Sequence, residues 1–152
     1  MAITALEART KILDDLAAAI DQTALAIASL GEAFEQLPDA AADRLESELF
    51  RPVQRAYALG KRTHAGFAAR HGHPTGAFEL PSPGLASQGV SSLVEQAIAA
   101  VLDADRRIAE LQDSMLPVES GDGELRSGLA DVRELLAPVP GSAREFLRTL
   151  GR

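Results

Sequence analysis

The chain contains no cysteine and no tryptophan, and aromatic residues make up only 4% of its 152 residues. Without cysteine there are no disulfide bonds, thiolate metal sites or cysteine nucleophiles. Because aromatic residues are scarce, the core must be built from Leu, Ile, Val and Ala. Ala and Leu favour helices, whereas aromatic and β-branched residues favour strands, so this composition predicts an all-α fold.

Long apolar runs and an excess of basic residues are also missing. No run of about 18 apolar residues occurs, which argues against a transmembrane helix. The opening segment MAITALEARTK carries Glu7, Arg9 and Lys11 and no apolar run, so we expect no signal peptide and a cytoplasmic location. A net charge of −7 argues against nucleic-acid binding, which needs a broad basic surface.

The clearest pattern is a heptad repeat near the beginning of the chain. One apolar row recurs every seven positions and consists of Leu6, Leu13, Ile20, Ile27 and Phe34. A second row, three positions later, consists of Leu16, Leu30 and Leu37, with Thr23 as its polar exception. This spacing predicts one long helix with a coiled-coil-like apolar seam. Thr4 and Glu7 form a capping box at its start, and Pro38 ends it.

A second long helix is predicted over residues 39–71, with Asp39 as its cap. Pro52 falls inside it and removes one backbone donor, which predicts a kink or a break there. The short turn between the two helices predicts an antiparallel hairpin. We expect Gly60 and Gly66 to lie opposite the alanines at 17–19, where small side chains permit close approach.

The rest of the chain predicts a loop and three further helices. Residues 72–90 are rich in Gly, Pro and Ser and predict a long loop, with Phe78, Leu80 and Leu85 packing partly onto the helices. A capping box from Ser92 to Glu95 should open the third helix, which carries Val94, Val101, Ile108 and Met115 and ends at Pro117. A fourth helix is expected over 123–137, and a box from Ser142 to Glu145 should open a short last helix. The loop is long enough to leave the direction of the third helix open.

These elements predict a single domain over residues 1–152. It should be an antiparallel four-helix bundle with a short C-terminal helix. Residues 1–71 would form the first hairpin, 72–90 the loop, and 91–152 the second hairpin with the last helix.

All three histidines, His64, His71 and His73, fall within ten residues of one another. His71 and His73 have a spacing that could chelate a metal, but a third ligand would have to come from elsewhere. We favour a helix end, because His71 lies in the last turn, Gly72 suits the position after it, and Pro74 prevents continuation.

Known catalytic and cofactor motifs are missing. The chain has no Glu-x-x-His for a di-iron centre, no G-x-S-x-G and no phosphate-binding loop. We therefore expect no cofactor and favour a non-enzymatic protein. The basic stripe of Arg51, Arg55 and Arg62 is best explained by pairing with acidic residues of other helices.

The leading hypothesis is action through protein–protein contacts, either with itself as a homo-oligomer or with another protein. The first hairpin is longer than the third helix, so apolar seam left uncovered would have to be buried by the long loop, by the C-terminal helix or by another subunit. A second hypothesis is a ligand pocket formed by Tyr57, His64 and Asp105, with the 72–90 loop as a lid. A third is membrane-surface association through the amphipathic last helix, whose apolar residues are Phe146, Leu147 and Leu150.

Overall fold

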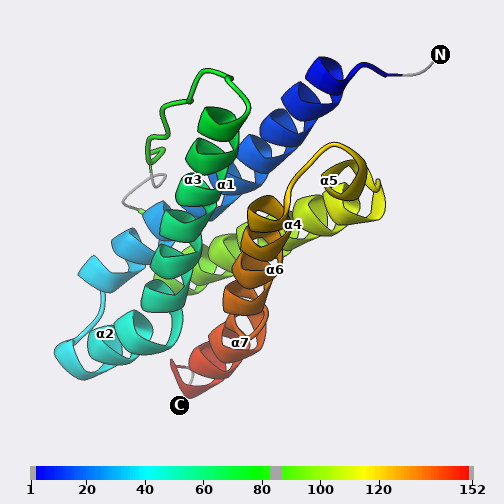
Figure 1. Ribbon diagram of the computed structural model, residues 1–152. Helices are drawn as coiled ribbons and strands as arrows, with labels where there is room; N and C mark the ends of the chain where they lie inside the picture. Colours follow the sequence, from blue (N-terminus) through cyan, green and yellow to red (C-terminus); the bar gives the residue numbers. More distant parts are fainter. Residues whose placement is uncertain (1–2, 83–86, 151–152) are drawn as a thin grey trace.

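A computed structural model describes residues 3–82 and 87–150, and every regular element within these ranges is a helix (Figure 1). The elements are α1 (Ala5–Glu35), α2 (Asp39–Leu45), a π-helical turn (Glu46–Phe50), α3 (Arg51–Arg70), α4 (Val90–Asp113), α5 (Leu116–Glu119), α6 (Gly123–Leu136) and α7 (Val139–Leu150). The prediction of an all-α fold is confirmed. None of the described helices is both long and apolar enough to cross a membrane.

Helix α1 begins with the predicted capping box. The Glu7 N–H donates to the Thr4 hydroxyl at 3.1 Å, and the Thr4 N–H donates to the Glu7 carboxylate at 3.3 Å. Three members of the first apolar row, Leu13, Ile20 and Ile27, are buried, but Leu6 is 65% exposed. Thr23 is buried and donates its hydroxyl to the Ala19 carbonyl at 3.0 Å. The polar exception in the seam is therefore satisfied within its own helix.

The predicted second helix is interrupted just before Pro52. The π-helical turn takes the Arg51 N–H to the Glu46 carbonyl, one residue further back than in an α-helix. Proline has no N–H, and its ring clashes with the carbonyl four residues earlier, so the wider turn accommodates it. The predicted cap was wrong: Pro38 is the N-cap of α2, and Asp39 lies inside the helix.

The four longest helices are α1, α3, α4 and α6, and they form two close pairs. Helix α1 packs most extensively against α4, and α3 against α6 (Figure 1). The Gln36 side chain donates to the Gln88 carbonyl at 3.0 Å, which brings the start of α4 to the end of α1. Helix α4 is therefore antiparallel to α1, which fixes the direction that the sequence left open.

The contact between α1 and α3 is less extensive than the predicted hairpin implied. A Cβ at Gly60 would lie 3.1 Å from Ile20 Cγ1, so Gly60 packs against the isoleucine that follows the alanine run. A Cβ at Gly66 would meet the side chain of Arg70, on its own helix. Of the two glycines, only Gly60 permits a close approach to α1.

Three predicted helix boundaries in the second half of the chain were wrong. Helix α4 begins at Val90 with Gly89 as its N-cap, so the box from Ser92 to Glu95 does not form. It ends at Asp113, and Met115 lies outside it with a φ of 66°. Helix α7 begins at Val139, so Pro140 stands in the first turn, where its missing N–H costs little. Ser142 then lies inside α7 and does not cap it.

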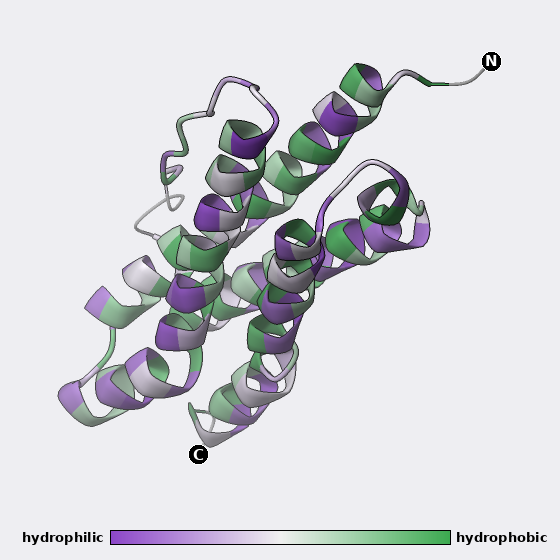
Figure 2. Ribbon diagram, viewed as in Figure 1, coloured by the Kyte–Doolittle hydropathy of each residue, from purple (hydrophilic) through white to green (hydrophobic). Residues whose placement is uncertain are grey.

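The segment that follows α3 folds back along that helix (Figure 1). Phe78 is partly buried and packs against the core, whereas Leu80 is exposed. Leu85 lies outside the described residues. Figure 2 shows that the hydrophobic faces of the helices mostly turn inward, but hydrophobic colour also extends to the first turn of α1 and to α5.

Candidate functional site

A cavity of about 410 Å³ lies between α1, α3 and the segment that follows α3. One face of helix α1 forms one wall of the cavity, and the segment after α3 forms the opposite wall. The lining residues are Thr10, Leu13, Asp14, Ala17, Asp21, His64, His73, Pro74, Gly76, Ala77 and Phe78. Part of the predicted loop therefore does cover His64.

His64 is only 6% exposed, and its Nδ1 atom has no hydrogen-bond partner among the described residues. The Phe78 ring meets the imidazole edge-on, with 5.1 Å between ring centroids. Gly76 lies over the ring, since a Cβ there would be 3.9 Å from His64 Cε1. Burial lowers the pKa of His64, opposed by a hydrogen bond with the Leu13 backbone and by the charge of Asp14. Burial therefore favours the neutral form of the imidazole.

The two residues predicted to join His64 do not line this cavity. Tyr57 is buried beneath the Lys61 ammonium, whose Nζ lies 4.3 Å from the ring centroid. Asp105 turns toward α6 and accepts from Arg133 at 2.8 and 3.3 Å. The three side chains stay apart because Asp105 is on the face of α4 that meets α6, whereas His64 is on the face of α3 that meets α1.

His71 and His73 form the end of α3, as the helix-end interpretation predicts. Gly72 has a φ of 70°, and the His73 N–H donates to the Ala68 carbonyl at 2.8 Å. The Gly72 N–H donates to the Ala69 carbonyl, which completes a Schellman ending. Among the described residues, no group of three or more His, Asp or Glu side chains is placed to hold a metal ion. His73 faces the His64 cavity, a proximity that spacing along the chain did not indicate.

A cluster around Asp122 was missed by the sequence analysis. Asp122 is the N-cap of α6 and accepts from the Leu125 N–H at 2.8 Å. The same carboxylate accepts from two nitrogens of Arg70 and lies 2.9 Å from Nε2 of His71. These contacts, above all the Arg70 hydrogen bond, hold the pKa of the Asp122 carboxyl well below its usual range. An aspartate before an amphipathic run is a capping signal, but its Arg partner lies 52 residues away.

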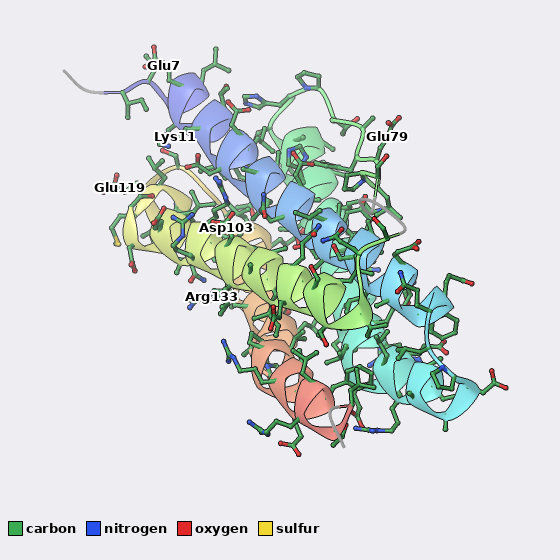
Figure 3. All side chains as sticks on the ribbon, turned by 180° about the vertical axis from the view of Figure 1, so that it is seen from behind. Glu7, Lys11, Glu79, Asp103, Glu119 and Arg133 are labelled. Carbon is green, nitrogen blue, oxygen red and sulfur yellow. The ribbon has the colours of Figure 1, made fainter. Side chains whose placement is uncertain are left out.

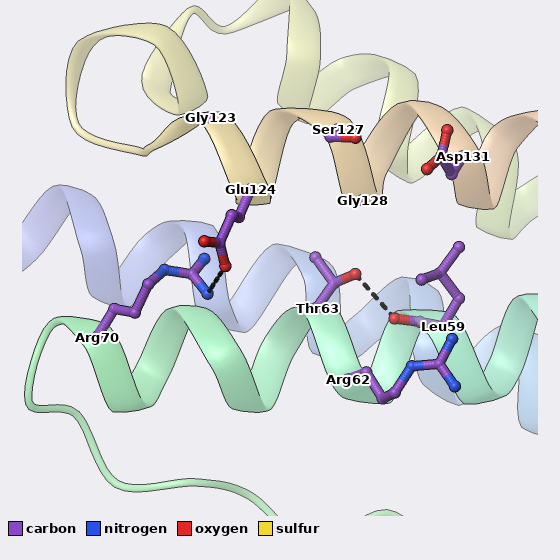
Figure 4. Close-up of a pocket in the computed structure, with 9 residues that line it drawn as sticks. All are labelled: Leu59, Arg62, Thr63, Arg70, Gly123, Glu124, Ser127, Gly128 and Asp131. Carbon is purple, nitrogen blue, oxygen red and sulfur yellow. Dashed lines mark hydrogen bonds and ion pairs between the residues drawn. The ribbon is translucent and has the colours of Figure 1, made fainter.

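A groove of about 370 Å³ lies between α3 and α6 (Figure 4). Its charged side chains are Arg62 and Arg70 from α3 and Glu124 and Asp131 from α6. Arg70 donates to Glu124 at 2.7 Å as well as to Asp122. Because both signs are present and Arg70 is already paired, this groove selects neither an anion nor a cation.

One end of the molecule exposes large apolar side chains. We call it the apolar end surface and define it by Ile3, Leu6, Met115 and Val118, which are 50%, 65%, 48% and 55% exposed. The first two lie at the start of α1 and the others at α5, which contacts α1. Figure 3 shows Glu7, Lys11 and Glu119 around this end. The surface therefore has an apolar centre and a rim of mixed charge.

The predicted apolar face of the last helix is turned inward. Phe146 is fully buried, and the Arg44 guanidinium lies 5.4 Å from its ring centroid. Leu147 and Leu150 are partly buried and pack against the core. In this structure Phe146 is therefore not available to a membrane surface.

None of the known protein families, curated proteins or solved structures compared with this chain matches it. Its function must therefore be inferred from its own residues. Two features have no evident role in holding the fold together: the apolar end surface and the cavity at His64.

Proposed function

We propose that this chain is a non-enzymatic four-helix bundle that acts through protein–protein contacts and associates with a second copy of itself through the apolar end surface. The main observation that supports this proposal is the exposure of Leu6. The next three members of its heptad row are at most 6% exposed, whereas Leu6 is 65% exposed. A seam that is buried along most of its length and open at one end favours a partner there.

Helix lengths explain why the seam is open. Helix α1 has 31 residues and α4 has 24, or about 46 Å and about 36 Å. The shorter helix cannot cover the whole apolar row of its partner. The two close helix pairs, α1 with α4 and α3 with α6, support the bundle arrangement that forms part of this proposal.

The mixed charge of the rim favours a second copy as the partner. In a twofold interface the same surface meets itself, so ion pairs across it require both signs of charge on that surface. Lys11 can meet Glu7 or Glu119 of the other copy, because its only ion pair among the described residues is an exposed one with Asp15 at 2.9 Å. Four half-exposed side chains make a smaller contact than a permanent interface does, so the dimer should be weak and concentration-dependent.

Sedimentation velocity over a range of concentrations tests the proposal. The wild-type chain should move from monomer toward dimer as its concentration rises. Leu6→Glu should remain monomeric, because it places a carboxylate at the centre of the contact. Leu102→Glu is the matched control, since Leu102 is 47% exposed on α4 and lies outside the apolar end surface. A wild-type chain that stays monomeric throughout, or equal effects of the two substitutions, would contradict the proposal.

A further inference from the structure

We propose that residues 74–82, which we call the strap, form a pH-dependent cover over His64. The strap stays closed while the imidazole is neutral and is released when the ring takes up a proton. It has no regular secondary structure and contributes Pro74, Gly76, Ala77 and Phe78 to the wall of the cavity. The proposal needs no ligand and does not depend on self-association.

The strap is anchored by one side chain. Phe78 is partly buried and packs against the core, whereas every other residue from 74 to 82 is exposed. Within the described residues the strap makes no hydrogen bond or ion pair. Its one ring contact joins Phe78 to His64, with 5.1 Å between ring centroids. Because a single partly buried ring is a small apolar contact, the strap can be released while the helices stay folded.

The strap covers the edge of the imidazole that carries both nitrogens. A Cβ built at Gly76 would lie 3.9 Å from His64 Cε1, and this carbon is bonded to both Nδ1 and Nε2. With the strap in place His64 is only 6% exposed. Release of the strap would therefore let water reach the part of the ring that takes up a proton.

A charged His64 is poorly accommodated beneath the closed strap. A protonated imidazole has an N–H on both nitrogens, whichever of them carries the proton in the neutral ring. Nδ1 is buried and has no hydrogen-bond partner among the described residues, so its N–H would have no acceptor. Burying a charge and an unpaired donor is costly, and water would satisfy both after release. Burial is also the largest cause of the lowered pKa of His64.

The other charged groups around the ring come from α1 and from the end of α3. Asp14 and Asp21 line the cavity from α1, and His73 lines it beside the strap. Lys61, the nearest basic residue along α3, is held over the Tyr57 ring and does not line the cavity. The two carboxylates attract a charged imidazole and so oppose release, but both are exposed and screened by water. His73 is also an imidazole, so its contribution must be tested separately.

The released strap should become more populated as the pH falls. After release the ring is in water, where a histidine has a pKa of about 6.5, whereas the closed strap lowers the pKa of His64. Above that pH the ring is neutral in both states, and the strap stays closed. Below it, the ratio of released to closed strap should rise by up to about tenfold for each pH unit, because only the released state binds the proton readily.

Amide NMR of the full-length protein between pH 7.5 and pH 5 tests the proposal through the backbone signals of Thr75 and Gly76. Phe78→Ala removes the anchor, so it supplies the signal positions of the released strap. In the wild type, both signals should differ from those positions at pH 7.5 and move toward them as the pH falls. Identical signals in the wild type and in Phe78→Ala at pH 7.5 would show that Phe78 does not hold the strap and would overturn the proposal.

Histidine variants identify the group that responds to pH. His64→Phe keeps a ring against Phe78 but cannot take up a proton, so its strap signals should stay at the closed positions down to pH 5. His64→Gln also lacks the titrating group, and its signals should show no pH-dependent movement wherever they lie. His73→Gln should behave as the wild type does. The proposal would be overturned by wild-type signals that do not move, by equal movement in the two His64 variants, or by loss of movement in His73→Gln.

Discussion

The Arg70 guanidinium and the Asp122 carboxylate form a two-point ion pair that joins the end of α3 to the start of α6. The Arg70 Nε–Asp122 Oδ2 distance is 2.8 Å, and the Nη2–Oδ1 distance is 2.9 Å. Both side chains are no more than about a third exposed, at 32% and 26%. Because Asp122 also caps α6, one carboxylate fixes the start of that helix and its position against α3.

Asp122→Ala should lower the free energy of unfolding by about 2 kcal/mol at pH 7, since it removes the cap and the ion pair together. Asp122→Asn should cost less than Asp122→Ala, because asparagine caps a helix as well as aspartate does but carries no charge. Urea denaturation followed by circular dichroism measures both. Equal losses in the two variants would show that the ion pair, and not the cap, provides the stabilisation.

The stability should depend on the ionisation of His64. The pKa of His64 is lower in the folded chain than in the unfolded chain, where it is about 6.5. Below that pH the unfolded chain therefore binds a proton more readily than the folded chain does. The stability contributed by the neutral ring is fully present above that pH. It is lost progressively as the pH falls toward the lowered pKa of the folded state. Urea denaturation between pH 7.5 and 5 should show this loss in the wild type and a smaller one in His64→Gln.

The contact between Gly128 on α6 and Thr63 on α3 should tolerate no added side chain. A Cβ at Gly128 would overlap the Thr63 side chain, with only 2.6 Å to its Cγ2 atom. Gly128→Ala should therefore destabilise the protein by about 1–3 kcal/mol, despite the better helix propensity of alanine. Adding Thr63→Ala should restore most of that loss in thermal unfolding measured by circular dichroism.

A second glycine provides the control for this contact. Gly141 in α7 has no neighbouring atom within 4 Å of a built Cβ. Gly141→Ala should therefore stabilise the protein slightly, by about 0.5–1 kcal/mol. A Gly128→Ala variant as stable as Gly141→Ala would show that α3 and α6 are not packed as closely as the structure indicates.

Local signals in the sequence predicted the helices but not all of their partners. The Thr4–Glu7 box and the Gly72 ending depend on neighbouring residues, and both form as predicted. Ser92 and Ser142 have the same box spacing, but their helices start earlier, at Val90 and Val139. Proline is tolerated in a first turn, so α7 can begin before Pro140 and include it.

The sites depended on tertiary contacts that spacing does not reveal. His64 and Asp105 are both on long helices, but which neighbour each faces is decided by packing. The pairing of Asp105 with Arg133 and of Asp122 with Arg70 joins residues 28 and 52 positions apart. The exposure of Leu6 also depends on where α4 ends, and the heptad pattern alone treats all members of the row alike.

Cross-linking through a single cysteine tests the self-association proposal most directly, because the natural chain has no cysteine. Leu6→Cys and the control Leu102→Cys would each be treated with a short bismaleimide at a concentration where dimer is expected. A covalent dimer should form rapidly from Leu6→Cys, since both copies present this residue at the contact, and slowly from Leu102→Cys. Equal, slow cross-linking of the two variants would contradict association through the apolar end surface.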